Sequence, residues 1–446
     1  MINKSLKKKI EIALIATFLS LLTLKDFIGI GVPSLAFTAV WILLILIADH
    51  DTSAAFTLGV VICFASTLSI TIPSAFFILW TIIKHHKQYT LHMVFWVSCS
   101  VALIEFFRFL LVPNESFRLY VNSMVVVLLV VTVITGLYNK FCDPVKCIKM
   151  YLGFYLFLTL DIIWATARAL GGIGQIISSS FRIGQVELAD KNVVGLLGVN
   201  SNGIALFSIL AIAFSLVLLN KKRIKLWAVL CITAYSTVVG LLTVSKTFVL
   251  VYVGFWALYV VWYIIKNGGN IFKPIVLICV IAVALIVISQ TSMAQNVIDG
   301  FINENDFTTG RVDLFKQYWD YMLNNGYNTF FGVGLQNLLE KTGLDTVPHN
   351  AILETYVCLG IVGVALFAVF FVFLIRLAIK FRKNNNETLF SFLAFLPFIT
   401  YIIFIQGMQF LRINYIYALI ALAFACMVTL STKEDSTESI QGKDLT

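Results

Sequence analysis

The feature of this sequence that most constrains its fold is a succession of apolar runs, each about long enough to cross a lipid bilayer. A hydrocarbon core of about 30 Å needs about 20 helical residues at 1.5 Å per residue. Only 12% of the residues are charged and 60% are hydrophobic, whereas a soluble domain has about 25% charged residues. The sequence therefore predicts an integral membrane protein. It excludes a soluble enzyme and a secreted disulfide scaffold, and nucleic acid is not an expected partner.

The runs predict an all-α bundle of about 14 (12–14) transmembrane helices. Residues 1–430 are expected to form one polytopic transmembrane domain, followed by a disordered cytoplasmic tail at 431–446. The expected spans lie near residues 11–30, 33–48, 54–70, 73–83, 91–111, 119–138, 146–165, 200–219, 226–243, 247–265, 274–290, 350–375, 388–406 and 411–430.

The stretch 54–83 fits either one overlong helix or two short helices, with a hinge at Thr71, Ile72 and Pro73, because proline cannot continue the helical hydrogen bonds. The basic residues favour two helices. With a cytoplasmic N-terminus, two helices place all the basic clusters on the cytoplasmic side, as the positive-inside rule requires. These clusters lie within residues 4–9, 84–87, 140–149, 221–225, 266–273 and 376–383.

The same topology leaves two long loops outside the cytoplasmic membrane, at about residues 166–199 and 291–349. The second loop has seven acidic and three basic residues, which is the balance expected of a translocated segment. Loops of this length usually carry function. We therefore expect both termini in the cytoplasm and the chemistry on the outer face of the membrane.

The second outer loop contains the pattern of an amphipathic helix from Arg311 to Leu323, with Thr309 suited to cap its N-terminus. We expect this helix to lie across the mouth of the bundle. Its apolar positions at helical spacing are Val312, Phe315, Trp319 and Met322, and its interfacial aromatic residues are Tyr318, Trp319 and Tyr321.

A glycine-containing turn, Phe331-Gly332-Val333-Gly334, follows this helix. The backbone amides of such a turn, including those of Gly332 and Gly334, can bind an anion, and a short helix is expected next at Leu335–Lys341. An isolated Gly-X-Gly has low specificity for this role.

The chain has five histidines, and the topology places only His349 outside. It precedes a predicted helix that opens at Asn350. As the one histidine predicted on this face, at the mouth of a helix beside the bilayer surface, it is a candidate functional residue. A capping or packing role for the same histidine is the alternative.

Three cations at the outer face are candidates for binding a phosphate group: Arg182, Arg311 and Lys246. A guanidinium binds phosphate with two parallel hydrogen bonds. Arg182 and Arg311 lie inside the outer loops, whereas Arg168 lies near a helix end and is expected to extend toward lipid headgroups. Lys246 lies at the outer junction of two helices and can join the two arginines.

Several common catalytic motifs are absent from the sequence: the nucleotide-binding glycine loops, the zinc-binding His-Glu-X-X-His and the Gly-X-Ser-X-Gly of serine hydrolases. The acidic run Glu304-Asn305-Asp306 is expected to be a solvated loop instead of a metal site. We therefore expect no metal and no cofactor, so the energy for any reaction must arrive with the substrate.

Residues 309–363 resemble the family of O-antigen ligases and O-antigen or capsular polysaccharide repeat-unit polymerases. The resemblance rests on Thr309-Gly310-Arg311, the aromatic helix, Phe331-Gly332-Val333-Gly334, His349-Asn350 with Glu354, and Gly360-Ile361-Val362-Gly363. Upstream, Asn200-Ser201-Asn202 resembles an asparagine-rich helix entry of that family, and Ser245-Lys246-Thr247 resembles its Ser-Arg-Ser/Thr step with lysine in place of arginine.

The resemblance implies a membrane glycosyltransferase of GT-C-like architecture in the bacterial cytoplasmic membrane. It implies an undecaprenyl-pyrophosphate-linked glycan donor, a glycan acceptor, metal-independent transfer with inversion, and a flippase and chain-length regulator as pathway partners. By this resemblance His349 is the general base, Arg311 and Arg182 hold the pyrophosphate, and Lys246, Gly332, Gly334 and Asn350 contact the substrate.

Three alternatives remain open from the sequence. The ligase and polymerase activities share these motifs, and we favour the polymerase because the composition rich in lysine, isoleucine and asparagine suggests an organism that lacks lipid A. A transporter or lipid-linked glycan flippase would also have many helices, although it would be expected to show internal repeats. A peptidoglycan polymerase would be expected to use an outer acid such as Asp306 or Asp313.

Overall fold

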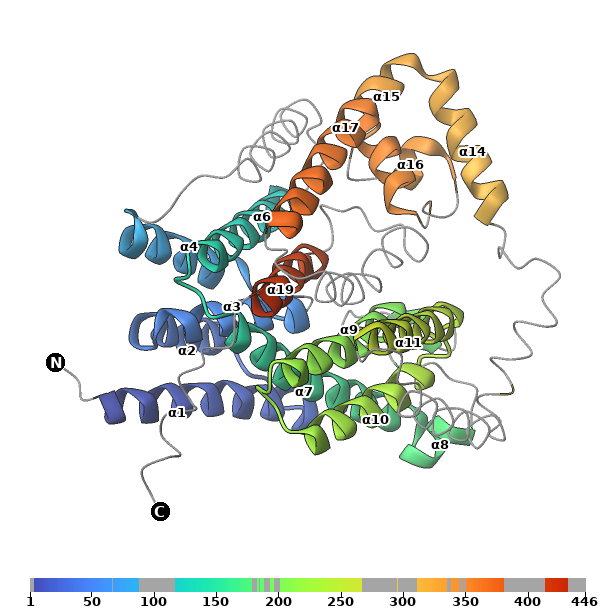
Figure 1. The fold of residues 1–446 in the computed structure, drawn as a ribbon. Helices are drawn as coiled ribbons and strands as arrows, with labels where there is room; N and C mark the ends of the chain where they lie inside the picture. The colour runs from blue at the N-terminus through green and yellow to red at the C-terminus, as the bar shows by residue number, and fades with distance from the viewer. Residues whose placement is uncertain are drawn as a thin grey trace.

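The computed structural model describes the chain as almost entirely helical (Figure 1). Three of the described helices are long and apolar enough to cross a membrane, and several shorter ones are also apolar. The helical membrane fold is thus as expected, whereas about 14 spans and a GT-C arrangement stay predictions. The structure describes residues 4–65, 67–87, 117–178, 183, 185–187, 193–195, 201–266, 295, 311–334, 338–344, 348, 350–380 and 414–431.

The N-terminal part of the chain forms α1 (Lys4–Leu22), a short π-helix η1 (Thr23–Ile28), α2 (Ser34–Ile47), α3 (His50–Phe64) and α4 (Thr71–His85). The stretch 54–83 is therefore two helices, as predicted. The break lies at residues 65–70 instead of at the proline, because Pro73 sits in the first turn of α4, where its missing N–H costs no hydrogen bond.

The middle of the chain continues with α6 (Phe117–Tyr138), α7 (Pro144–Leu170) and α8 (Ile173–Ser178). Asp143 caps α7, since its Oδ1 accepts a hydrogen bond of 2.8 Å from the amide of Val145. The first outer loop contains two short antiparallel strands, β1 (Gln185–Glu187) and β2 (Val193–Gly195), that the apolar pattern did not predict.

The chain continues with three long helices, α9 (Ser201–Asn220), α10 (Leu226–Leu242) and α11 (Lys246–Lys266). They are followed by α14 (Arg311–Asn324), α15 (Gly326–Phe331), α16 (Leu338–Thr342), α17 (Ala351–Lys380) and α19 (Asn414–Ser431). The predicted spans near 91–111, 274–290 and 388–406, and the predicted disorder of 432–446, lie outside the residues that the structure describes.

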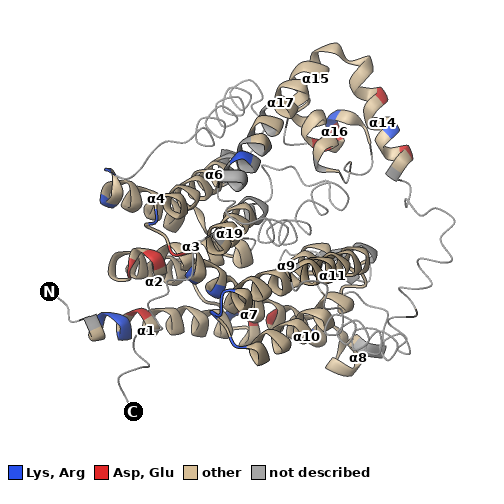
Figure 2. Cartoon of the chain, viewed as in Figure 1, with Lys and Arg blue, Asp and Glu red and all other residues tan. Residues whose placement is uncertain are grey.

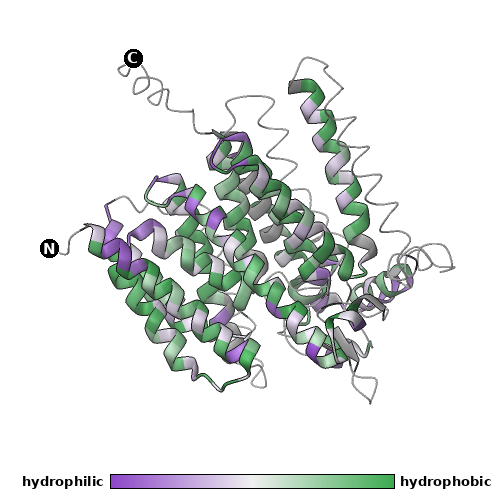
Figure 3. Cartoon of the chain, turned by 90° about the horizontal axis from the view of Figure 1, so that it is seen from below, coloured by the Kyte–Doolittle hydropathy of each residue, from purple (hydrophilic) through white to green (hydrophobic). Residues whose placement is uncertain are grey.

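The core of the bundle surrounds α9 and α19, which are buried on all sides along most of their length. A helix that is apolar all round belongs in such a central position. On the other side of α7, aromatic rings interlock edge to face: Phe18 of α1 contacts Phe37, Trp41, Phe56 and Phe154 with ring centroids 5.0–6.5 Å apart. Hydrophobic residues run along most helices, and hydrophilic ones gather at the N-terminal end of α1 (Figure 3).

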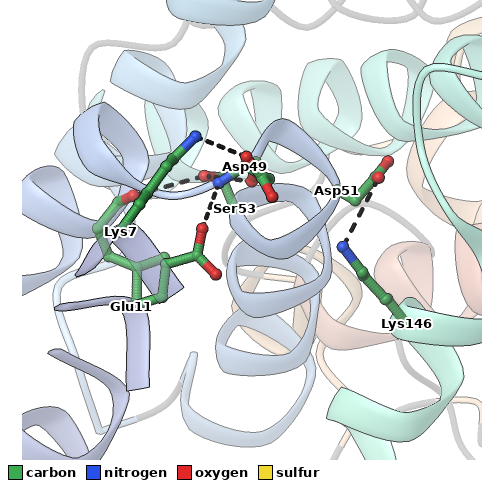
Figure 4. Close-up of polar contacts among 7 residues, drawn as sticks. Lys7, Glu11, Asp49, Asp51, Ser53 and Lys146 are labelled. Atoms are coloured by element: carbon green, nitrogen blue, oxygen red, sulfur yellow. Dashed lines mark hydrogen bonds and ion pairs between the residues drawn. The ribbon is translucent and has the colours of Figure 1, made fainter. Parts of the chain in front are cut away.

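A polar cluster fastens the beginning of α1 to the α2–α3 turn (Figure 4). Lys7 Nζ lies 2.5 Å from Asp49 Oδ1, and Glu11 Oε1 accepts a 2.7 Å hydrogen bond from the amide of Asp49. The hydrogen bond from Lys7 lowers the pKa of Asp49. A second ion pair joins Lys146 of α7 to Asp51 of α3 at 3.7 Å. Two ion pairs thus join the beginnings of α1 and α7 to the region where α3 begins. In Figure 2 the basic residues at the ends of α1 and α4 lie on the same side of the molecule.

Candidate functional site

The second outer loop folds into a small helical unit made of α14, α15, α16 and the beginning of α17, which we call the outer unit. In Figure 1 its helices lie together at one end of the molecule, with α15 alongside α17. The predicted amphipathic helix is present as α14, with its start at Arg311 as expected and its end one residue later than expected. The short helix predicted at Leu335–Lys341 is found as α16, Leu338–Thr342.

The buried face of α14 differs from the predicted one. Tyr318 and Met322 are fully buried, whereas Val312 and Trp319 are exposed. Tyrosine can occupy the interior when its hydroxyl finds a partner there, and the hydroxyl of Tyr318 forms a hydrogen bond with the side chain of Thr342. The half-buried Tyr321, one turn later, donates to the carbonyl of Lys341 at 3.1 Å. The face that packs inside the unit is therefore turned by about one residue from the apolar stripe, and Tyr318 is not an interfacial residue.

Burial raises the pKa of Tyr318 to about 12. Two nearby groups, the thiol of Cys358 and the carboxyl group of Glu354, also raise it, which places this ring against the first half of α17. Tyr318 is therefore a neutral structural residue at any physiological pH.

Two glycines allow the backbone after α15 to meet the backbone of α17. Both have left-handed conformations, with φ of 71° at Gly332 and 67° at Gly360. A Cβ atom on Gly332 would overlap the backbone of Cys358 and Leu359, and one on Gly360 would overlap the backbone of Phe330 and Phe331. The two glycines therefore form a crossing at which no side chain fits between the chains.

The helical hydrogen bonds of α17 are interrupted at Gly360, where ψ is −165°. The carbonyls of Val357 and Cys358 accept hydrogen bonds of 2.8 and 2.9 Å from the amides of Val333 and Gly334. The turn thus satisfies carbonyl groups that the break in α17 would otherwise leave without partners. The predicted single helix at 350–375 is therefore two half-helices joined at Gly360.

The same hydrogen bonds correct the anion-binding prediction for Gly332 and Gly334. The amide of Gly332 donates to the carbonyl of Asn328 at 2.6 Å, and the amide of Gly334 donates to Cys358. These amides are already used within the protein, so they do not form an anion cradle. Lys341 further fixes the turn, because its Nζ donates to the carbonyl of Val333 at 2.9 Å.

The sequence around the outer histidine begins α17 with a well-formed cap. Asn350 Oδ1 accepts hydrogen bonds of 3.0 Å from the amides of both Ile352 and Leu353, so Asn350 is the N-cap residue. Glu354, one turn later, is 2% exposed. Pro348 is also buried. His349 itself lies outside the residues that the structure describes.

A second group of predicted residues lies at the outer ends of α9, α10 and α11. Ser245 Oγ donates to Asn202 Oδ1 at 3.0 Å, so the structure brings together the two upstream motifs. The amide of Ile183 donates to the carbonyl of Leu242 at 3.1 Å, which joins the first outer loop to the same place. Val244 has a φ of 49°, a strained conformation for a β-branched residue and one found most often near functional sites.

The candidate cations are placed only in part. Lys246 begins α11, directly after Ser245, and Arg311 begins α14, but the positions of their side chains are not described. Arg182 and Thr309 lie outside the described residues. Arg182 directly precedes Ile183 in the sequence. The amide of Ile183 donates a hydrogen bond to the carbonyl of Leu242, which lies three residues before Ser245. The described part of the chain contains no cluster of three histidine, cysteine or acidic side chains that could hold a metal ion.

Two features were missed from the sequence. The Ser245–Asn202 contact was not predicted, although both residues had been noted in motifs, because their pairing depends on helix packing across 43 positions. The structural role of Lys341 was also missed. The sequence does contain a signal for this role: Lys341 lies in the last turn of a short helix and close in sequence to a glycine turn, whose carbonyl groups a lysine can bind.

Part of the chain resembles a known protein family. No curated protein matches the chain. Residues 231–368, from α10 to the second half of α17, match the family model described as O-antigen ligase. This segment contains Ser245, Lys246, the outer unit and the Gly332–Gly360 crossing. The match agrees with the resemblance noted in the sequence: this segment is similar to the O-antigen ligase family, and it lies in a chain whose described helices include three long and apolar enough to cross a membrane.

Proposed function

We propose that this protein polymerises polyprenyl-pyrophosphate-linked oligosaccharide repeat units into a surface polysaccharide, at the outer face of the bacterial cytoplasmic membrane. The observation that carries the proposal is the O-antigen ligase match over residues 231–368, because it includes His349, Arg311 and Lys246. A helical membrane protein gives a lipid-linked donor access to these groups from within the bilayer.

In the proposed reaction, a hydroxyl oxygen of the acceptor sugar attacks the anomeric carbon of the donor. The bond between that carbon and the pyrophosphate oxygen breaks, and the pyrophosphate leaves on its lipid carrier. His349 takes the proton of the hydroxyl as general base. Arg311, Arg182 and Lys246 bind the pyrophosphate and stabilise the charge that grows on its oxygen. A single displacement of this kind inverts the anomeric configuration.

The arrangement of α17 supports this assignment of roles. Asn350 caps the first half-helix, so the positive end of that helix dipole lies next to His349 in the sequence. The upstream motifs support it in another way: the Ser245–Asn202 hydrogen bond fixes the turn that precedes Lys246. With Ile183 bonded to Leu242, the chain next to Arg182 is held at this turn as well.

Ligation, the transfer of a finished glycan to another acceptor, is the second candidate, since the matching family model is described as O-antigen ligase. The two activities use the same donor and differ in the acceptor. They can be separated by their products: a polymerase mutant accumulates single lipid-linked units, whereas a ligase mutant accumulates long lipid-linked polymer.

The test is complementation of a polymerase-deficient strain with the wild-type chain and with His349→Ala, Arg311→Lys and Asp306→Ala, at matched levels in the membrane. Asp320→Asn, at an exposed position of α14, is the control for changes in the outer unit. We expect His349→Ala to lose long polymer and to accumulate single lipid-linked units, whereas Asp306→Ala and Asp320→Asn keep polymer. Arg311→Lys is expected to be impaired because an ammonium cannot replace a bidentate guanidinium.

Two results would count against the proposal. Full polymer length in the His349→Ala strain would exclude this residue as the base and favour a transporter or an acid-dependent polymerase, the latter if Asp306→Ala is inactive. Failure of the wild-type chain to restore long polymer in this strain, together with rescue of a ligase-deficient strain that retains long glycan on the lipid carrier, would identify the protein as a ligase.

A further inference from the structure

The helix α15 has its polar side inside and its aromatic side outside. Asn328 Nδ2 donates to the hydroxyl of Tyr321 at 3.3 Å, and Thr329 Oγ1 donates to the carbonyl of Met322 at 2.5 Å, so the polar residues of α15 bind α14. Tyr327, Phe330 and Phe331, at i, i+3 and i+4, form the opposite face and are 72%, 57% and 49% exposed. In water the two faces would be reversed.

The stretch of sequence that carries this aromatic face has no charged residue of its own. From Tyr321 to Leu339 the sequence contains no lysine, arginine, aspartate or glutamate. The rings of Tyr327 and Phe331 contact each other with centroids 5.4 Å apart. A cluster of exposed aromatic rings without charged neighbours in the sequence is unusual on a surface that faces water, and it is common where a protein meets the headgroup region of a bilayer.

The glycine crossing fixes the level of α15 along α17. Gly360 touches the backbone of Phe330 and Phe331, and the half-helix after Gly360 runs from Ile361 to Lys380. About 20 residues at 1.5 Å each span about 30 Å, the thickness of the hydrocarbon core. No charge occurs in this half-helix before Arg376. The outer boundary of the bilayer therefore falls near Gly360, at the height of α15.

The aromatic face is also continuous with a lipid-facing surface. Ile361, directly after the crossing, is 48% exposed, and Val369 and Val372 further along the same half-helix are exposed as well. In a membrane-spanning helix such exposed aliphatic side chains contact lipid. The half-helix before Gly360 carries the buried Glu354 and the cap residue Asn350, which suits a position above the bilayer.

We propose that the aromatic face of α15, formed by Tyr327, Phe330 and Phe331, inserts into the outer leaflet of the bilayer at the level of the lipid headgroups. It anchors the outer unit to the membrane surface beside α17. This role differs from that expected of α14, whose Tyr318 is buried within the protein. The anchor does not depend on which reaction the protein catalyses, so it can be tested separately from the proposed function.

The experiment uses the full-length protein in lipid nanodiscs, with a bimane fluorophore on Tyr327→Cys or Phe330→Cys. Asp320→Cys, at an exposed polar position of α14, is the matched control. Wild-type protein treated in the same way gives the background from the eight native cysteines. Quenching is measured with lipids that carry a nitroxide near the headgroup, with lipids that carry it deep in the acyl chain, and with aqueous iodide.

We expect the shallow nitroxide to quench the labels at 327 and 330 at least about twofold more than the label at 320, and iodide to show the opposite order, as for aromatic residues at an interface. Iodide quenching at 330 as strong as at 320 would overturn the proposal, because the face would then be in water. Protection from both quenchers would also overturn it, since protein would then cover the face. Stronger quenching by the deep nitroxide would contradict the assigned level.

Discussion

At the scale of single residues, the outer unit depends on positions where one atom more or less changes the structure. Gly332 and Gly360 have left-handed backbones and lie against each other's neighbouring peptide groups. Asn350 uses one side-chain oxygen to satisfy two amides at the start of α17. These roles are local, and each leads to a substitution with a defined outcome.

Replacing either crossing glycine with alanine is expected to destabilise the protein strongly. The new Cβ overlaps backbone atoms that cannot rotate away, in addition to about 1–2 kcal/mol for a left-handed non-glycine residue. Thermal unfolding of the purified protein should therefore begin at a clearly lower temperature for Gly332→Ala and Gly360→Ala. Gly326→Ala is the control, because a Cβ there has open space. Equal stability of the three variants would show that the chains do not cross here.

The cap at Asn350 predicts that aspartate, but not alanine, can replace it. Asn350→Ala should lose about 1 kcal/mol of stability, whereas Asn350→Asp keeps the accepting oxygen and adds a favourable charge at the helix N-terminus. Thermal unfolding and polymer length are measured for both. If Asn350→Asp were as stable as the wild type but inactive, the amide would be a substrate contact, as the family resemblance implies.

At the scale of elements, periodicity predicted which segments are helices but not where they break. The helix at 311–323 was predicted nearly to the residue because its N-terminal boundary and its charges are local signals. The break in α17 was not predicted, because Ile352 to Ile375 contains only one charged residue and glycine is common in membrane helices. The break is stabilised by the amides of Val333 and Gly334, from another part of the chain, because they donate hydrogen bonds to the carbonyls of Val357 and Cys358.

The candidate site was predictable in composition and only partly in arrangement. Counting spans predicts that His349, Arg182, Arg311 and Lys246 lie on one side of the membrane, but no local pattern in the sequence predicts how close to each other they come. The glycines were assigned to an anion because an isolated turn leaves its amides free. In the folded chain these amides bind Asn328 and Cys358, a long-range effect that periodicity does not report.

The link between α1 and the α2–α3 turn should contribute stability that depends on pH. The pKa of Asp49 is lowered in the folded protein, so its contribution is present above the ordinary carboxyl pKa and is lost as the pH falls through the lowered value. Both side chains are partly exposed, so we expect less than about 1 kcal/mol. A double-mutant cycle of Lys7→Met and Asp49→Asn should show coupling at pH 7 that is lost as the pH falls well below the ordinary carboxyl pKa. Coupling that persists in acid would exclude the ion pair as its source.

At the scale of the whole molecule, the orientation in the membrane is the prediction from which all the functional assignments follow. Many of the described basic residues lie at the ends of α1 and α4 and in the turn between α9 and α10, whereas the outer unit carries both basic and acidic residues on α14 and α16 (Figure 2). If the positive-inside rule holds, the turn between α9 and α10 is cytoplasmic, and the first and second outer loops are outside.

This orientation can be checked with reporter fusions. Alkaline phosphatase, which is active only after export, should be active when fused after Ser178 or Asn324 and inactive when fused after Arg223 or Ser431. A fluorescent protein that folds only in the cytoplasm should give the reverse order at the same four positions. Exchanged signals after Arg223 would invert the topology and place His349 in the cytoplasm, where it could not meet an exported donor.

The Gly332–Gly360 crossing also has a consequence for how the outer unit holds together. The chain leaves the crossing at Val333 and returns to it at Leu359. About 27 residues between these points form a loop whose two ends are held together without a covalent bond. The entropy cost of closing such a loop grows only slowly with its length. Two backbone hydrogen bonds and a glycine contact hold that neck. The segment containing Pro348 and Asn350 is therefore tethered at both ends to one point of α17, so a force applied to it by a bound sugar chain is passed directly to a membrane helix.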